Sequence, residues 1–149
     1  IAYQKTNRVF VKSNFARGSD LLITEVACEL NIPVDACLPF SYEKTLENIK
    51  DDAKLNKCSF TKEDEVKWRN LIAQSFFYHE IENGVLNPYE KALKFIIDES
   101  HVLLTLWDGV ETPLVDENGS PINRGGTYDG IMLAKQKGLK IHMIPCKRK

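Results

Sequence analysis

The sequence predicts an α/β fold, a three-layer sandwich in which helices cover both faces of a mainly parallel sheet. Three observations favour it. Short runs of strand-forming residues alternate with stretches of helical periodicity at both ends of the chain, the middle (roughly 41–101) has mainly helical signals, and "VLLTLW" at 102–107 is a continuous apolar run. Alternating strands and helices are typical of parallel sheets. A continuous apolar run is typical of a strand buried on both faces.

Composition indicates one globular domain over residues 1–149, because 43% of the residues are hydrophobic and 28% are charged. Lys and Arg number 20 against 21 Asp and Glu, which gives no electrostatic reason to expect nucleic acid or an anionic membrane as partner. No apolar run approaches the roughly 20 residues of a membrane span, and no signal peptide is recognisable, so we expect a cytoplasmic protein. A start at Ile1 rather than methionine, soon followed by a strand, favours a piece of a longer protein that lacks an upstream strand.

The first elements form a predicted βαβ unit. Residues 8–13 ("RVFVKS") are a short strand-like run. Residues 18–31 ("GSDLLITEVACELN") place apolar side chains at helical spacing, and "IPVDACLPF" from Ile32 is a second strand. Two strands joined by a helix predict parallel pairing through a right-handed crossover.

The middle is predicted as a helical insertion between the second and third recognisable strands. Thr61 with Asp64 resembles a capping box, and the apolar stripe that follows predicts a helix. Asn87 as N-cap and Pro88 as first helical residue predict the start of another. The aromatic residues here are expected in the core rather than as a platform for a ligand. They are Trp68, Phe76, Phe77 and Tyr78.

The last unit is predicted as a strand from Val102, a helix over 127–138 that stops at Gly138, and a final strand "KIHMIP". The irregular stretch 109–126 is long for a compact domain, and such loops are usually functional or mobile.

Neither a metal site nor a disulfide framework is predicted. The four cysteines, Cys28, Cys37, Cys58 and Cys146, are far apart and form no C-x-x-C pair, so we expect reduced, mostly buried thiols. The histidines give no catalytic signal. His79 is assigned to the aromatic helix, His101 precedes a strand and His142 lies within one, so each is expected to pack or to face solvent.

Two loops have the form of a phosphate-binding turn. "SNFARGSD" at 13–20 joins the first strand to its helix, and Arg124-Gly125-Gly126-Thr127 precedes the last helix. Glycines let the backbone approach a phosphate, the helix start supplies N–H groups, and arginine adds a charged donor. Neither loop is a P-loop or a G-x-G-x-x-G fingerprint. A flexible tip with an ordinary helix cap explains either loop taken alone, whereas their equivalent positions after strands favour a ligand.

These residues resemble a family. "ARGSDLLITEVACELNIPVDACLPF" and "LLTLWDG" with "RGGTYDGIMLAKQKGLKIHMI" are similar to the two signatures of the SLOG superfamily. That superfamily includes DprA-like and cytokinin-activating LOG proteins, amino-terminal domains of TRPM channels, and sensor domains of anti-phage systems. The resemblance covers both ends of the chain, and the helical middle matches only in general character.

The resemblance implies a Rossmann-like fold and a pocket for a nucleotide, often one that contains adenosine or ADP-ribose, with no other cofactor required. It also implies a homo-oligomer or an attached effector domain. Carried over position by position, the first loop and the Gly-Gly-Thr turn would hold the ligand. With the neighbouring strand end, the candidate ligand-binding residues are Arg17, Gly18, Ser19, Asp20, Asp108, Gly109, Arg124, Gly125, Gly126 and Thr127.

Asp129 lies close to the position of the catalytic glutamate of LOG enzymes, but one helical step early and in a shortened motif. An enzyme would cleave an N-glycosidic bond of a nucleotide or NAD-like substrate, as LOG proteins and the more distant nucleoside deoxyribosyltransferases do. Asp129 or Asp108 would then stabilise or trap the oxocarbenium centre. Otherwise Asp129 only complements the helix dipole.

Three functions stay open: a nucleotide sensor, which the intact loops and the displaced acid favour, an N-glycosidic enzyme, and an interaction domain that has lost its ligand.

Overall fold

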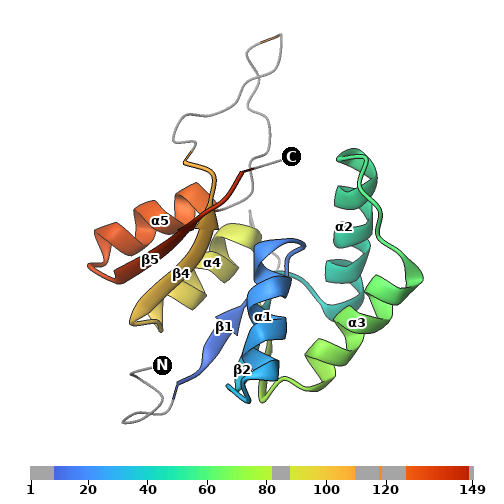
Figure 1. Cartoon of the computed structure of the whole chain (residues 1–149), viewed down its shortest axis with the longest axis horizontal. Helices are drawn as coiled ribbons and strands as arrows, with labels where there is room; N and C mark the ends of the chain where they lie inside the picture. Colours follow the sequence, from blue (N-terminus) through green and yellow to red (C-terminus); the bar gives the residue numbers. More distant parts are fainter. Residues whose placement is uncertain (1–8, 82–87, 110–117, 119–126, 148–149) are drawn as a thin grey trace. The chain divides into compact units, whose positions relative to one another are not determined.

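The computed structural model describes residues 9–81, 88–109, 118 and 127–147. The chain has an α/β fold in which parallel strands alternate with helices, as predicted. In order, its elements are β1 (Val11–Ser13), α1 (Ser19–Glu29), β2 (Val34–Leu38), α2 (Tyr42–Leu55), α3 (Lys62–Ala73), β3 (Phe77–Glu80), α4 (Pro88–Asp98), β4 (Val102–Trp107), α5 (Thr127–Gln136) and β5 (Lys140–Pro145). The chain divides into two compact units, Ile1–Ala92 and Leu93–Lys149, with the boundary inside α4 (Figure 1).

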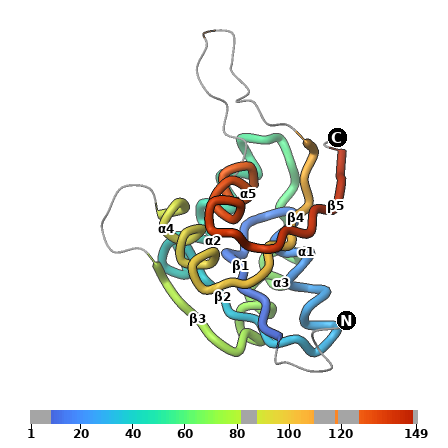
Figure 2. The backbone as a smooth tube through the Cα atoms, turned by 90° about the vertical axis from the view of Figure 1, so that its left-hand side faces the viewer, coloured from blue at the N-terminus to red at the C-terminus, as the bar shows by residue number. Residues whose placement is uncertain are grey.

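The first unit contains a three-stranded sheet of order β1-β2-β3, which Figure 2 shows as neighbouring traces. All pairs are parallel. Val11 pairs with Val34 across β1 and β2, and Asp35 pairs with Phe77 across β2 and β3. The predicted βαβ unit is therefore confirmed. All five residues of the central strand β2 are buried.

The core of the first unit lies between one face of this sheet and the helices. Val34, Ala36 and Leu38 alternate along β2, so they point to the same face, and all three belong to the main hydrophobic cluster. Helix α3 contributes Trp68, which is fully buried. The cluster comprises Phe15, Ala27, Ile32, Val34, Ala36, Leu38, Leu46, Ile49, Trp68, Leu71 and Ile72.

Two predicted helix starts and one helix stop are confirmed. Thr61 and Asp64 form a reciprocal capping box at the start of α3, with the Asp64 N–H 3.2 Å from the Thr61 hydroxyl. Helix α4 begins at Pro88, while Asn87 lies outside the described residues. Helix α5 ends at Gln136, and Gly138 follows in a left-handed conformation with φ 73°.

The second unit is a parallel pair, β4 and β5, with α5 packed along both strands (Figure 1). The register runs from Val102 opposite Lys140 to Trp107 opposite Pro145. Gly130 lets α5 approach α4, because a Cβ at this position would lie 3.2 Å from a methyl carbon of Leu93.

Three predictions about the middle and the last strands are wrong. Phe77, Tyr78 and His79 belong to strand β3 and not to a helix. The aromatic side chains there are not core. Phe76, just before β3, is 68% exposed, and Phe77 and Tyr78 are exposed as well, so nothing that the structure describes covers these rings fully. Nor is β4 buried on both faces. Leu104 is 45% exposed, while its neighbour Thr105, on the opposite face, is buried.

Helix α1 is confirmed, but its apolar stripe is mostly outside the core. Thr24 and Ala27 are its buried residues. Leu22, Val26 and Leu30 are exposed.

Candidate functional site

The loop between β1 and α1 brings Arg17, Gly18, Ser19 and Asp20 together at the carboxyl end of β1. Gly18 is the N-cap of α1 and has φ 96° and ψ −124°, a backbone conformation open to glycine and costly for other residues. Its carbonyl accepts the first helical hydrogen bond, from the Leu22 N–H at 3.1 Å. Gly18 has no side chain to accept hydrogen bonds from the N–H groups of the first turn, and its α-carbon faces open space. This helix start has the properties of an anion-binding turn.

Asp20, the acidic residue of this loop, has a raised pKa. Burial raises its pKa from 3.8 to about 6, against the opposing effect of hydrogen bonds from the Ala16 N–H and the Ser19 side chain. The carboxyl therefore retains a proton in part of the population near neutral pH. Carboxyl groups whose pKa is raised by burial are frequent at functional sites, because catalysis and binding often need a pKa tuned away from its ordinary value.

Arg17 has a partner within the first unit. Its Nε lies 3.5 Å from a carboxylate oxygen of Asp52 on α2. Both side chains are partly exposed, so this ion pair is weak and the guanidinium can turn to a ligand at small cost.

The second predicted loop is described only at its two ends. Asp108 and Gly109 follow β4 directly, and Gly109 has a left-handed φ of 80°. Thr127 is the first residue of α5, and Asp129 lies exposed in its first turn. Asp129 therefore has the position of an acid that complements the helix dipole. The predicted ligand residues Arg124, Gly125 and Gly126 lie outside the described residues, as does most of 109–126.

Sequence reasoning missed a charged cluster on the sheet of the first unit. The Asp35 carboxylate on β2 accepts a hydrogen bond from the Lys12 ammonium on β1 at 2.5 Å. Its other oxygen lies 3.2 Å from Nε2 of His79 on β3. The Asp35 side chain is 4% exposed and that of His79 is 42% exposed. His79 belongs to a strand and not to the predicted helix, while its partly exposed side chain agrees with the expectation of a packing or surface residue.

No local signal could have found this cluster, because it depends on strand register. Asp35 and Cys37 point to the face of β2 opposite the core cluster, and parallel pairing puts Lys12 and His79 beside them. A buried carboxylate is a costly arrangement that persists only when its partners, here the Lys12 ammonium and the His79 imidazole, are present.

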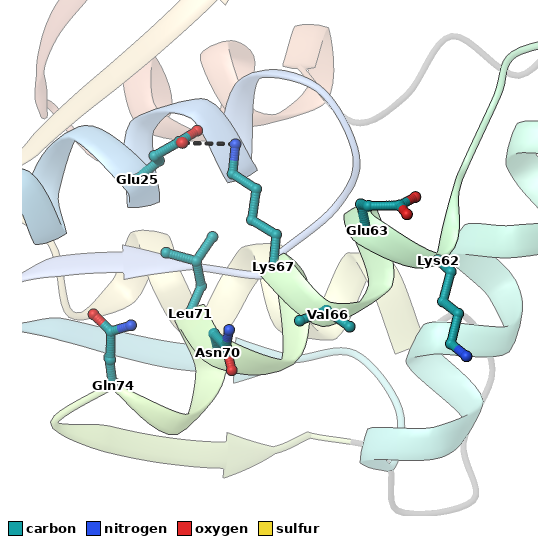
Figure 3. A pocket seen from close by; sticks show the side chains of 8 residues that line it. All are labelled: Glu25, Lys62, Glu63, Val66, Lys67, Asn70, Leu71 and Gln74. Carbon is teal, nitrogen blue, oxygen red and sulfur yellow. Dashed lines mark ion pairs between the residues drawn. The ribbon is translucent and has the colours of Figure 1, made fainter.

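A hollow of about 570 Å³ lies along α3, where α1 faces it (Figure 3). An ion pair between Lys67 and Glu25 at 2.6 Å spans its rim, and Val66 and Leu71 give it an apolar floor. The hollow contains none of the predicted ligand-binding residues.

None of the four cysteines forms a disulfide, but only Cys37 is buried and Cys58 is exposed, so the expectation of mostly buried thiols is wrong. Within the described ranges, no three His, Cys, Asp or Glu side chains form a group that could hold a metal ion. No described helix is long and apolar enough to cross a membrane.

Comparison of the chain with protein-family models and with curated proteins finds no match.

Proposed function

We propose that the chain is a nucleotide-sensing domain of the SLOG type. It binds a nucleotide, or a small molecule derived from ADP-ribose or NAD, through phosphates docked at helix starts. The observation that carries the proposal is the start of α1. Its N-cap is a glycine in a glycine-specific conformation, and none of the side chains that the structure describes caps the first-turn N–H groups. A phosphate at this position would accept those N–H groups and meet the positive end of the helix dipole.

The proposal includes a Rossmann-like, doubly wound sheet. Support comes from the order of strands within each unit. The parallel orders β1-β2-β3 and β4-β5 both occur as parts of the doubly wound sheet of order 3-2-1-4-5-6. In such sheets, ligands bind beyond the carboxyl ends of strands. The loop that carries Arg17 and Gly18 directly follows Ser13, the last residue of β1.

Sensing, in this proposal, means binding without turnover, with the signal passed to a second copy or to an attached effector domain. The alternative is an enzyme that cleaves the bond between base and ribose. Asp129 is exposed at the start of α5 and therefore accessible to a substrate. An enzyme requires that Asp129→Asn abolish the release of base while binding is largely kept.

Calorimetric titration with AMP, NAD, ADP-ribose and its cyclic isomers tests the proposal, with each sample then separated by chromatography. Binding with the ligand recovered intact is the expected result. Release of free adenine or nicotinamide would refute the sensor and support the enzyme that cleaves the N-glycosidic bond. Absence of heat with every ligand would refute both and leave the interaction domain.

A further inference from the structure

Phe15 has an unusual backbone for a buried aromatic residue. It lies in the loop between β1 and α1, its side chain is fully buried, and its φ is 59°. Left-handed backbone is rare for bulky residues, because Cβ then crowds the following carbonyl oxygen. The other described non-glycine residues with positive φ, Asn31 and Lys57, follow the ends of α1 and α2, where this conformation is common. Phe15 alone lies before a helix, so its conformation needs a different explanation.

Two side chains hold both polar groups of the Phe15 backbone. Its N–H donates to the hydroxyl of Ser13 at 3.1 Å, and its carbonyl accepts a hydrogen bond from the indole N–H of Trp68 at 3.1 Å. Both hydrogen bonds are buried. Trp68 comes from α3, which lies 53 residues further along the chain. The left-handed conformation is therefore held by one local contact, from Ser13, and by one tertiary contact, from Trp68.

Ring packing fixes Trp68 in the orientation that this hydrogen bond requires. The Phe15 and Trp68 rings meet edge to face, with centroids 6.4 Å apart and planes at 86°. Tyr42 of α2 also packs against the indole, with centroids 5.1 Å apart and planes at 64°. Trp68 thus contacts two aromatic rings and is itself fully buried. Such an arrangement preserves a strained backbone, because the surrounding structure leaves no alternative.

The consequence concerns the residues that follow. Phe15 is separated from the N-cap Gly18 by only two residues, and the Ala16 N–H donates to the side-chain oxygen of Asn14 at 3.4 Å. A change of φ at Phe15 would redirect this short connection and turn the first-turn N–H groups of α1 away from a common point. Preorganised donors bind an anion more tightly than donors that must first be ordered.

We propose that Trp68 is a positioning residue, whose indole N–H holds the loop between β1 and α1 in its anion-binding conformation before any ligand arrives. The role of Trp68 in ligand binding rests on the proposed function. Its effect on the conformation of the loop does not require a ligand. Trp68 does not touch the ligand and acts only through Phe15.

The sharpest test replaces Trp68 by 3-benzothienylalanine, which keeps the bicyclic ring and puts sulfur in place of the N–H. Trp68→Phe is a second variant, accessible by ordinary mutagenesis. Ile72→Ala is the matched control, because Ile72 lies one turn further along α3 in the same hydrophobic cluster. The control lowers stability through the core without removing the hydrogen bond to Phe15.

Two readouts separate positioning from general stability. The first is amide hydrogen exchange of residues 16–21 without ligand, at conditions where all variants are equally folded. We expect exchange about five- to tenfold faster in the benzothienyl variant than in the control, the change that one hydrogen bond of ordinary strength supports. The second is titration with inorganic phosphate and with ADP-ribose, in which affinity falls by a similar factor in the benzothienyl variant and stays unchanged in the control.

Equal exchange in the benzothienyl variant and the control would overturn the inference, even if the wild-type chain binds ADP-ribose. Faster exchange at 16–21 without any binding by the wild-type chain would instead refute the proposed function and leave Trp68 as the residue that fixes the loop. If Trp68→Phe does not fold, the benzothienyl variant, which preserves the packing, still tests whether the indole N–H positions the loop.

Discussion

Asp20→Asn should stabilise the chain at neutral pH. Burial is the main cause that raises the pKa of this carboxyl from 3.8 to about 6. A tenfold change in proton affinity corresponds to about 1.4 kcal/mol, so the ionised carboxylate costs the folded chain about 3 kcal/mol. Asparagine has nearly the same shape, can still accept a hydrogen bond and carries no charge to bury. We expect the free energy of unfolding at pH 7.5 to rise by about 1–3 kcal/mol.

The sign of the pH dependence follows from the direction of this change. Between pH 3.8 and about 6, the folded chain binds more protons at Asp20 than the unfolded chain does. Wild-type stability therefore falls as pH rises through this window, relative to the variant, and the difference is constant above it. Below pH 3.8 the two proteins converge, because Asp20 is protonated in both the folded and the unfolded chain.

Urea unfolding of both proteins at intervals from pH 3.5 to 8 measures the difference directly. Glu47→Gln, which neutralises an exposed acid on α2, is the control and should shift stability by much less. A variant that is no more stable than wild type at pH 7.5, or a difference that does not change with pH, would refute the account of Asp20 as a carboxyl destabilised by burial.

Four further changes have defined outcomes. Asp35→Asn should lower the free energy of unfolding by about 3 kcal/mol, since it leaves the Lys12 ammonium without the buried carboxylate that accepts its hydrogen bond; a loss below about 1 kcal/mol in urea unfolding would contradict a buried ion pair. Thr61→Ala should lower the free energy of unfolding by about 1 kcal/mol, because the helix cap is lost, whereas Thr61→Ser should keep most of that stability. Equal thermal stability of the two variants would argue against the cap. Gly18→Ala should cost about 1–3 kcal/mol by strain, because its φ of 96° disfavours any side chain although space is open; a neutral result in calorimetric unfolding would mean that the loop relaxes. Cys58, which is exposed, should react with an alkylating reagent well before Cys37, which is buried, as followed by mass spectrometry of the folded protein; comparable rates would indicate that the region around β2 opens readily.

The parts of the fold with strong local signals could be predicted from sequence. The capping box at Thr61, the proline start of α4 and the glycine stop after α5 each act through a residue whose backbone preference is specific. The parallel pairing of β1 and β2 followed from the short helical connection between two strands.

Strand β3 had no such signal. Helix α3 ends at Ala73 with Gln74 as C-cap, so neither glycine nor proline separates the helix from the aromatic residues that follow. Most residues of β3 are exposed, and the alternation of polar and apolar residues that marks a half-buried strand is absent.

The candidate site could be predicted only in part. Glycine and arginine after a strand pointed to the loop of Arg17 and Gly18, because these residue types suit an anion. The left-handed Phe15 and its hydrogen bond from Trp68 could not be foreseen, since nothing in a phenylalanine favours positive φ and the partner lies on another helix. The cluster around Asp35 depends in the same way on strand register and not on spacing.

Ser19 offers the most direct test of the central claim that phosphate docks at the start of α1. Ser19→Asp places a negative charge in the first turn, where it favours the helix dipole but repels a phosphate. Ser19→Asn has the same size without the charge and is the matched control. We would titrate the wild-type chain and both variants with ADP-ribose by calorimetry, after confirming equal folding. The account predicts binding by wild type and Ser19→Asn and at least a tenfold loss in Ser19→Asp, the effect of about 1.4 kcal/mol. Equal affinity in all three proteins would contradict it, because the phosphate would then lie elsewhere.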